Sequence, residues 1–342
     1  MSQPLVLVTG ATGFIAKHCI AELLRQGYPV RGTVRDPARS GDAVRRAMQN
    51  AGVDAAALTL AAADLERDDG WDAAVAGCSH VLHVASPFPI QQPKDRGEIV
   101  RPARDGALRV LRAATKAGVQ RVVLTSSAVA IMYAAGRVPG HVYTEADWTD
   151  VTRSDLTPYM VSKTLAERAA WDYWHTTPGA PQLVAINPGF VQGPALDDDL
   201  STSLEVQRLM GKGAYPGAPS ITFPISDVRD VAAIHVLAMT HAKAAGERFI
   251  AANGTSSLMG MGRVIAATLP DLKFKVPKFE LPDMVVRGLA KFDKRLVAVL
   301  PELGAVRGCS NAKARDVLGF SFRDADTAIR DGALSLRSLG VI

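Results

Sequence analysis

Short apolar runs alternate with amphipathic stretches through the first half of the chain. The candidate strands are residues 5–8, 30–34, 58–61, 81–84 and 121–125, and the amphipathic stretches include residues 13–26, 42–49 and 101–117. Strands that are apolar throughout and separated by helices are typical of a parallel sheet covered on both faces. The pattern therefore predicts an α/β fold with a Rossmann-type doubly wound parallel sheet. Two later apolar runs, 183–186 and 248–251, extend the same sheet.

The regular alternation stops near residue 187. Residues 189–220 are rich in Gly, Pro, Ser and Asp, and residues 253–342 are broken by several prolines, whereas residues 221–252 return to the sheet pattern. Such shifts in composition mark boundaries between lobes. We expect a dinucleotide-binding domain of residues 1–186 plus 221–252. A smaller, interleaved and mainly C-terminal substrate lobe would comprise residues 187–220 plus 253–342.

Composition excludes several classes of function. The net charge is +5, with 39 basic and 34 acidic residues spread along 342 positions, so no basic patch predicts nucleic-acid binding. Three scattered cysteines and seven histidines form no metal-ligand pattern and are typical of a reduced, cytoplasmic protein. No apolar run reaches the length of a membrane span, and the apolar run at 5–8 is too short for a signal peptide.

A glycine-rich loop follows the first strand. It reads Thr9-Gly-Ala-Thr-Gly-Phe-Ile-Ala16 and leads into a helix. Gly10 permits a tight turn, Gly13 lets a phosphate approach the backbone, and the helix N-terminus favours its negative charge. We therefore expect the loop to bind a dinucleotide pyrophosphate. The candidate contacts are Gly10, Thr12, Gly13, Phe14 and Ile15.

The end of the second strand indicates which dinucleotide binds. Arg35 stands where an NAD enzyme usually carries a carboxylate, and Arg39 follows it. A guanidinium provides the fork of donors that suits a 2′-phosphate, so the sequence favours NADPH over NADH. The alternative is a solvated arginine, with Asp36 reaching a ribose hydroxyl instead.

The ends of the third and fourth strands supply further candidate contacts. Asp64 and Leu65 follow the third strand, and Asp64 suits either the adenine amino group or a helix cap. The small residues Val84, Ala85 and Ser86 close the fourth strand, where they would let the dinucleotide lie across the strand ends.

A tyrosine and a lysine four residues apart are the candidate catalytic pair. Tyr159 and Lys163 would share one face of a helix that starts after Pro158, and Thr125-Ser126-Ser127 ends the fifth strand. We expect Lys163 to lower the pKa of Tyr159, which would then protonate a developing alkoxide. Ser127 would orient the carbonyl oxygen, with Ser126 as the competing candidate. Lys163 would also hold the nicotinamide ribose hydroxyls, and Thr125 and Tyr159 are further candidate cofactor contacts.

Together these motifs resemble the extended short-chain dehydrogenase/reductase family. The resemblance rests on residues 9–16, 33–37, 63–65, 83–87, 125–127, 159–167, 187–194, 227–231 and 318–320 and covers nearly the whole chain. Within that family the chain is similar to the dihydroflavonol reductases, cinnamoyl-CoA reductases and microbial aldehyde or ketone reductases. The resemblance implies NADP(H) as cofactor and Ser127, Tyr159 and Lys163 as a catalytic triad. It also implies that Pro188 and Val191 lie against the nicotinamide ring.

Departures from the family pattern narrow the substrate. The segment before Tyr159 lacks the cinnamoyl-CoA signature, and Met132 stands where dihydroflavonol reductases carry an Asn. A CoA thioester and a flavonoid are therefore both disfavoured. Met132 would instead help to form an apolar pocket. The four candidate pocket residues are Phe88, Met132, Phe190 and Phe223. The default alternative for each is a side chain that packs in the hydrophobic core and does not contact the substrate.

The sequence as a whole predicts an NADPH-dependent carbonyl reductase acting on a small or medium, largely apolar aldehyde or ketone. The alternatives are a nucleotide-sugar epimerase or dehydratase of the same family, and a regulator that senses NADP without turnover. Helices near 101–117 and 156–175 are candidates for a homodimer interface.

Overall fold

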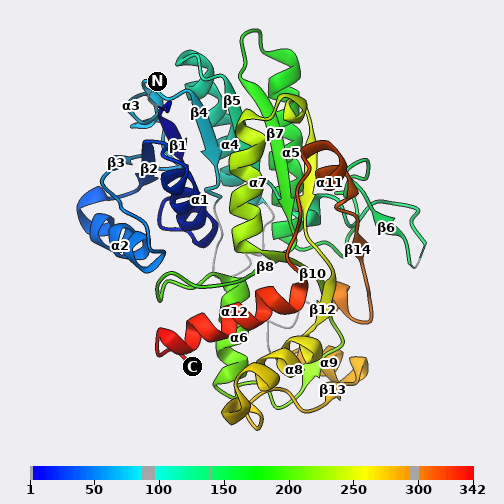
Figure 1. The fold of residues 1–342 in the computed structure, drawn as a ribbon. Coiled ribbons are helices and arrows are strands. Elements are labelled where there is room, and N and C mark those ends of the chain that lie inside the picture. Colours follow the sequence, from blue (N-terminus) through cyan, green and yellow to red (C-terminus); the bar gives the residue numbers. More distant parts are fainter. Residues whose placement is uncertain (1–2, 87–96, 139, 293–299) are drawn as a thin grey trace.

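A seven-stranded parallel sheet forms the centre of the computed structural model, which describes residues 3–86, 97–138, 140–292 and 300–342. The strand order is β11-β7-β5-β4-β1-β2-β3 (Figure 1). The strands are β1 (Val6–Val8), β2 (Val30–Val34), β3 (Leu58–Ala62), β4 (His80–His83), β5 (Arg121–Thr125), β7 (Gln182–Pro188) and β11 (Arg248–Ala251). The order reverses between β1 and β4, which defines the point where open α/β sheets bind ligands. The predicted doubly wound fold is thereby confirmed.

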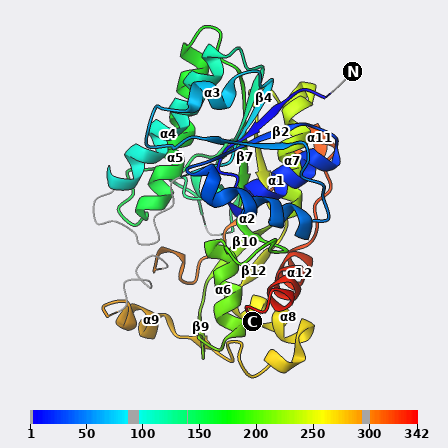
Figure 2. The ribbon, with the colours of Figure 1, turned by 90° about the vertical axis from the view of Figure 1, so that its left-hand side faces the viewer.

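Helices cover both faces of the sheet, so most strand residues are buried except along the edge strand β3 (Figure 2). On one face lie α1 (Phe14–Arg25), α2 (Pro37–Asn50), α7 (Val228–Thr240) and α11 (Ala312–Leu318). On the other lie α3 (Trp71–Val75), α4 (Gly97–Lys116) and α5 (Pro158–Thr176), with α4 packed along α5. Each layer buries its apolar stripe against the strands, and this burial is the main stabilising term of the domain.

A second, smaller sheet lies below the first in Figures 1 and 2. Its order is β12-β10-β8, formed by β8 (Phe190–Gln192), β10 (Thr222–Asp227) and β12 (Thr255–Ser257). Helices α6 (Thr202–Gly211), α8 (Leu258–Thr268) and α12 (Ala325–Ser338) share an apolar cluster beside it. Segment 221–252 therefore contributes to both sheets. Its first strand, β10, pairs with β8, and the chain rejoins the large sheet only through α7 and β11.

The remaining elements are short. They comprise strands β6 (Val142–Tyr143), β9 (Ala218–Pro219), β13 (Glu280–Leu281) and β14 (Gly308–Cys309), helix α9 (Asp283–Leu289), and the 3₁₀ turns η1 (Ala128–Ala130), η2 (Ala242–Ala244), η3 (Pro270–Leu272) and η4 (Leu300–Glu302). Among the described residues, no helix combines the length and apolar character needed to cross a bilayer.

Candidate active site

The glycine loop joins β1 to α1 at the sheet edge where the order reverses. Gly10 has φ of +69°, and a Cβ placed on it would lie 2.9 Å from the Cβ of Ala85. Its amide donates to the hydroxyl of Thr33 on β2 at 3.0 Å. Only glycine meets both demands, since other residues are strained at positive φ. Gly10 thus brings the loop directly against the residues that follow β4.

The N-terminus of α1 is open toward solvent. Gly13 is the N-cap and is exposed, so no side chain satisfies the first amide groups of the helix, and no acidic residue lies in the first turn. Thr12, Phe14 and Ile15 are partly exposed beside it. Unpaired amides at a helix N-terminus attract an anion. These residues therefore fit the pyrophosphate of a dinucleotide, as the sequence predicts.

The two arginines after β2 are exposed, and the acidic residue between them caps a helix. Asp36 is the N-cap of α2, where its carboxylate accepts from the amides of Ala38 and Arg39 at 3.0 and 3.2 Å. Arg35 and Arg39 lie exposed on either side of this cap. Capping engages one oxygen of Asp36, and the two exposed arginines remain the candidate groups for a 2′-phosphate.

Asp64 shapes a turn. Its carboxylate accepts from the amide of Glu66 at 3.0 Å, and its carbonyl accepts from the indole of Trp71 at 2.9 Å. Leu65 packs against Gly106 of α4. Val84, Ala85 and Ser86 are partly exposed beyond β4. The structure thus gives Asp64 a local capping role and leaves its predicted contact with adenine untested.

The two serines after β5 have different partners. The hydroxyl of Ser126 donates to the carboxylate of Glu167, whereas Ser127 hydrogen-bonds to the phenol of Tyr159. Thr125 directs its hydroxyl to His235 on α7, at 2.7 Å, and offers only its carbonyl to the amine of Lys163, at 3.5 Å. Ser127 is therefore the serine that stands beside the candidate acid.

Helix α5 carries the tyrosine and the lysine where the sequence predicts them. Thr157 caps the helix by accepting from the amide of Met160 at 3.3 Å, and Pro158 occupies the first turn, where a missing N–H costs nothing. Lys163 is buried one turn after Tyr159, and burial lowers its pKa to about 8 even though Glu167 acts to raise it.

The predicted lowering of the Tyr159 pKa is wrong. Burial of the hydroxyl raises the pKa of Tyr159 above its ordinary value of 10.0, and the hydrogen bond from Ser127 offsets this only in part. The physical reason is that desolvation disfavours the charged phenolate. Tyr159 therefore keeps its proton at neutral pH.

The residues predicted to form the far side of the cleft lie around β7 and β8. Pro188 ends β7, and Val191 is buried in β8. Phe190 and Phe223 stack across β8 and β10, with ring centroids 4.6 Å apart. Met132 is buried in an apolar cluster that includes Ile131, Tyr133, Leu156 and Met160. Phe88 lies outside the described residues. Their roles toward nicotinamide or substrate remain predictions.

Sequence reasoning missed two buried residues close to the triad. Glu167 accepts hydrogen bonds from several side chains, and Asn187 donates to the carbonyl of Ser127 at 3.2 Å. Both lie in motifs that carry the family resemblance, but nothing in their spacing indicates contact between them. The described residues contain no group of three or more His, Cys, Asp or Glu able to hold a metal ion.

Comparison with known proteins identifies the family. A model of the NAD dependent epimerase/dehydratase family matches residues 6–252, more than half of the chain. The chain belongs to this family. The extended short-chain dehydrogenase/reductase resemblance drawn from the motifs is thereby confirmed.

Several reductases of this family are similar along most of their length. Ketoreductase azaE of Aspergillus niger is 35% identical over 351 residues, covering 97% of each protein. Cinnamoyl-CoA reductase CAD2 of Medicago truncatula is 38% identical over 248 residues, covering 70% of this chain and 74% of the plant enzyme. The crystal structure of yeast methylglyoxal/isovaleraldehyde reductase Gre2 complexed with NADPH has a TM-score of 0.80 and 26% identity, with 99% of this chain and 100% of that chain covered.

Proposed function

We propose that the protein is an NADPH-dependent carbonyl reductase that reduces small or medium, largely apolar aldehydes and ketones. The observation that carries the proposal is the hydrogen bond between Ser127 and Tyr159, with Lys163 one helical turn away. The open glycine loop lies at the same end of the sheet. Similarity to reductases, one of them solved with NADPH, supports the same conclusion.

The cofactor fits the residues present. The first amides of α1 and Gly13 would hold the pyrophosphate, and Arg35 and Arg39 would hold the 2′-phosphate. Bound NADPH supplies the hydride that reduces the carbonyl carbon. Pro188 and Val191 would lie against the nicotinamide ring, where their apolar side chains would help to exclude water.

The side chains of the triad handle the oxygen and its proton. Ser127 holds the carbonyl oxygen in line with Tyr159. Tyr159 enters the reaction protonated, because burial raises its pKa, and donates its proton to the developing alkoxide. The ammonium of Lys163 and the hydroxyl of Ser127 then stabilise the phenolate that remains.

The apolar substrate class rests on two aromatic side chains of the smaller sheet. Phe190 and Phe223 form a stacked pair that is partly exposed where β8 and β10 meet. An aromatic surface of this kind favours apolar groups, and one added or missing methylene is weakly discriminated by such surfaces. We therefore propose that the protein accepts a broad range of aldehydes and ketones as substrates. Two further proposals are a cytoplasmic location and a homodimer formed through α4 and α5.

The decisive experiment measures NADPH oxidation by the purified protein against a panel of aldehydes and ketones, with chiral analysis of the alcohols. We expect turnover of several apolar members of the panel. Tightly retained dinucleotide without net NADPH consumption would instead indicate an epimerase or dehydratase. NADPH binding with no turnover across the panel would indicate a sensor.

A further inference from the structure

A buried carboxylate lies one turn beyond the proposed catalytic lysine. Glu167 is 1% exposed, and the proposed mechanism does not use it. Its two oxygens accept hydrogen bonds from Ser126, Trp171, Asn187 and Arg248. A buried carboxylate with this many donors is held in a single position, since each donor would lose a partner if it moved.

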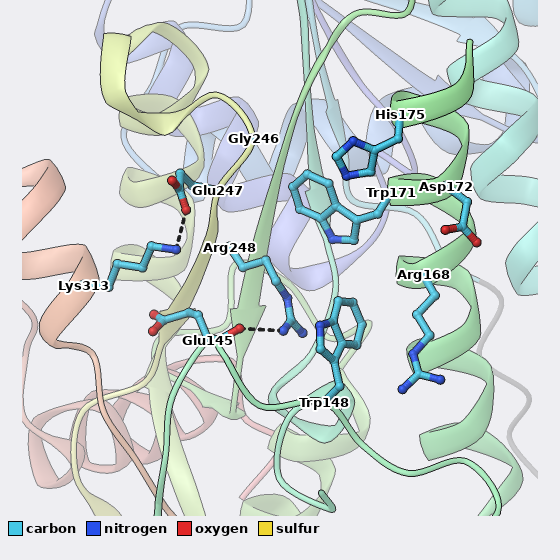
Figure 3. Close-up of a pocket in the computed structure, with 10 residues that line it drawn as sticks. All are labelled: Glu145, Trp148, Arg168, Trp171, Asp172, His175, Gly246, Glu247, Arg248 and Lys313. Carbon is cyan, nitrogen blue, oxygen red and sulfur yellow. Dashed lines mark hydrogen bonds and ion pairs between the residues drawn. The ribbon is translucent and has the colours of Figure 1, made fainter.

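Arg248 closes this network on the outer side. It is the first residue of the edge strand β11, and its guanidinium lies 2.6 Å from Glu167 and donates to the carbonyls of Glu145 and Asp147 at 2.8 and 3.0 Å. The same group lies over the ring of Trp148, 3.6 Å from its centroid. Figure 3 shows Arg248 pointing toward Trp148 at the wall of a surface pocket of about 580 Å³.

On the inner side the network holds the segment that carries Ser127. Ser126 donates its hydroxyl to Glu167, and the amide of Asn187 donates to Glu167 at 2.9 Å and to the carbonyl of Ser127 at 3.2 Å. Glu167 thus fixes the chain on both sides of the Ser127 hydroxyl. That hydroxyl is left to face Tyr159.

The same carboxylate lies beside the amine of Lys163. Both residues line a small cavity of about 20 Å³, together with His83. The groups that face the amine are Glu167 from α5, the carbonyl of Thr125 from β5, and His83 from β4. His83 is neutral at physiological pH because burial lowers its pKa to about 3. Glu167 is therefore the negative charge near Lys163 in the described part of the chain.

We propose that Glu167 is a positioning residue for the reduction, which orients Ser127 through Ser126 and Asn187 and keeps Lys163 charged. This inference rests on the proposed function. Arg248 acts indirectly, through Glu167, because it compensates the charge of that carboxylate and holds it in place.

The test is Glu167→Gln, which keeps the size of the side chain and removes its charge. We expect kcat to fall at least about tenfold, with the KM for NADPH within about twofold of the parent, because the acid and serine are misplaced while the cofactor site is intact. The basic limb of the kcat/KM profile should move to lower pH, since loss of the neighbouring negative charge lowers the pKa of Lys163. Parental kcat per folded molecule with a parental profile would overturn the proposal.

A matched control separates positioning from stability. Asp230 on α7 is also buried and ion-paired, with Arg323, and lies outside the proposed site. Asp230→Asn should lower the midpoint of thermal unfolding and leave the pH profile of the folded fraction unchanged. An equal shift of the profile in Asp230→Asn would show that any buried ion pair has this effect and would overturn the assignment to Glu167.

A second variant covers the case in which Glu167→Gln does not fold. The double variant Glu167→Gln/Arg248→Met removes both charges, so it leaves no unpaired charge in the interior. It should show the same loss of kcat and the same shift in pH, and parental values would overturn the proposal. Suppose that the parent turns over carbonyls and Tyr159→Phe does not. Parental kcat and a parental pH profile in Glu167→Gln would then refute the role of Glu167 and leave the proposed function intact. A parent without turnover refutes the proposed function.

Discussion

Ser126 and Ser127 are adjacent in the chain, but their hydroxyls have different partners. Ser126 donates to Glu167 in the interior, and Ser127 hydrogen-bonds to Tyr159. The backbone at Ser127 is extended, with φ of −159° and ψ of 152°, and consecutive side chains of extended backbone point in opposite directions. One serine therefore serves the packing of the site, and the other is available to the substrate.

This arrangement predicts unequal effects of two alanine substitutions. Ser127→Ala should lower kcat/KM for a carbonyl substrate by about a hundredfold, because the oxygen loses a donor that acts in the transition state. Ser126→Ala should have a smaller effect on kcat/KM and a larger effect on thermal stability, since Glu167 loses a buried donor. Steady-state kinetics and thermal unfolding of both variants measure this. A larger loss of activity in Ser126→Ala would assign the catalytic role to Ser126.

Tyr159→Phe should lower kcat by about two to four orders of magnitude with the fold retained, because the phenol is the proposed general acid. Tyr173→Phe is the matched control on the same helix. The hydroxyl of Tyr173 hydrogen-bonds to Thr115 of α4 at 3.0 Å, away from the strand ends, so its loss should leave kcat unchanged. Near-parental turnover in Tyr159→Phe would remove Tyr159 from the mechanism.

The exposed Arg35 should determine the preference for NADPH. Arg35→Ala should lower kcat/KM for NADPH by about tenfold, the loss of one charge-assisted contact at an exposed site, and leave the value for NADH unchanged. Arg25→Ala, at the opposite end of α1 from the glycine loop, is the control and should change neither value. Kinetics with both cofactors provide the measurement. Equal efficiency of the parent with NADH would refute a 2′-phosphate site.

Alanine substitutions at Gly10 and Gly27 distinguish the cost of backbone strain from the cost of a steric clash. Both have positive φ, but a Cβ at Gly10 would lie 2.9 Å from the Cβ of Ala85, and one at Gly27 would meet nothing within 4 Å. Gly27→Ala should cost only the strain, about 1–2 kcal/mol in the free energy of unfolding. Gly10→Ala should cost more and also weaken NADPH binding. Urea unfolding and NADPH fluorescence titration test this, and equal costs with unchanged binding would contradict it.

Lys163 should make stability increase with pH above neutrality. Its pKa is about 8 when folded against 10.5 for the exposed amine, so between these pH values the unfolded chain binds more protons. The cost of burying the charge is therefore present below pH 8 and disappears as pH approaches 10.5. Lys163→Met removes this dependence, and its stability relative to the parent should fall by about 2 kcal/mol between pH 7 and 10.

Urea unfolding of Lys163→Met and the parent at several pH values measures that difference. Lys116→Met is the control, because the side chain of Lys116 is 72% exposed and its charge is not buried on folding. A difference for Lys163→Met that stays constant with pH would show that the amine titrates normally in the folded protein.

Local patterns in the sequence determined where the elements lie. The strands at 30–34, 121–125 and 248–251 have the bounds predicted from their apolar runs, and α5 begins at Pro158, one residue before the predicted start. Short-range chemistry suffices for this, because a buried parallel strand must be apolar along its length and Pro suits a first helical turn. The same local reasoning placed the glycine loop, the serine pair and the Tyr159–Lys163 pair at one end of the sheet.

Only the tertiary structure decided what each polar group does. In the folded chain Ser126 donates a hydrogen bond to Glu167, Asp36 caps a helix, and β10 pairs with β8. Burial also raises the pKa of Tyr159 above its usual value. These outcomes depend on burial and on hydrogen-bond partners far apart in the chain, such as Glu167 and Arg248. Desolvation and long-range hydrogen bonding act through distance in space, and no periodicity or spacing in the sequence records that distance.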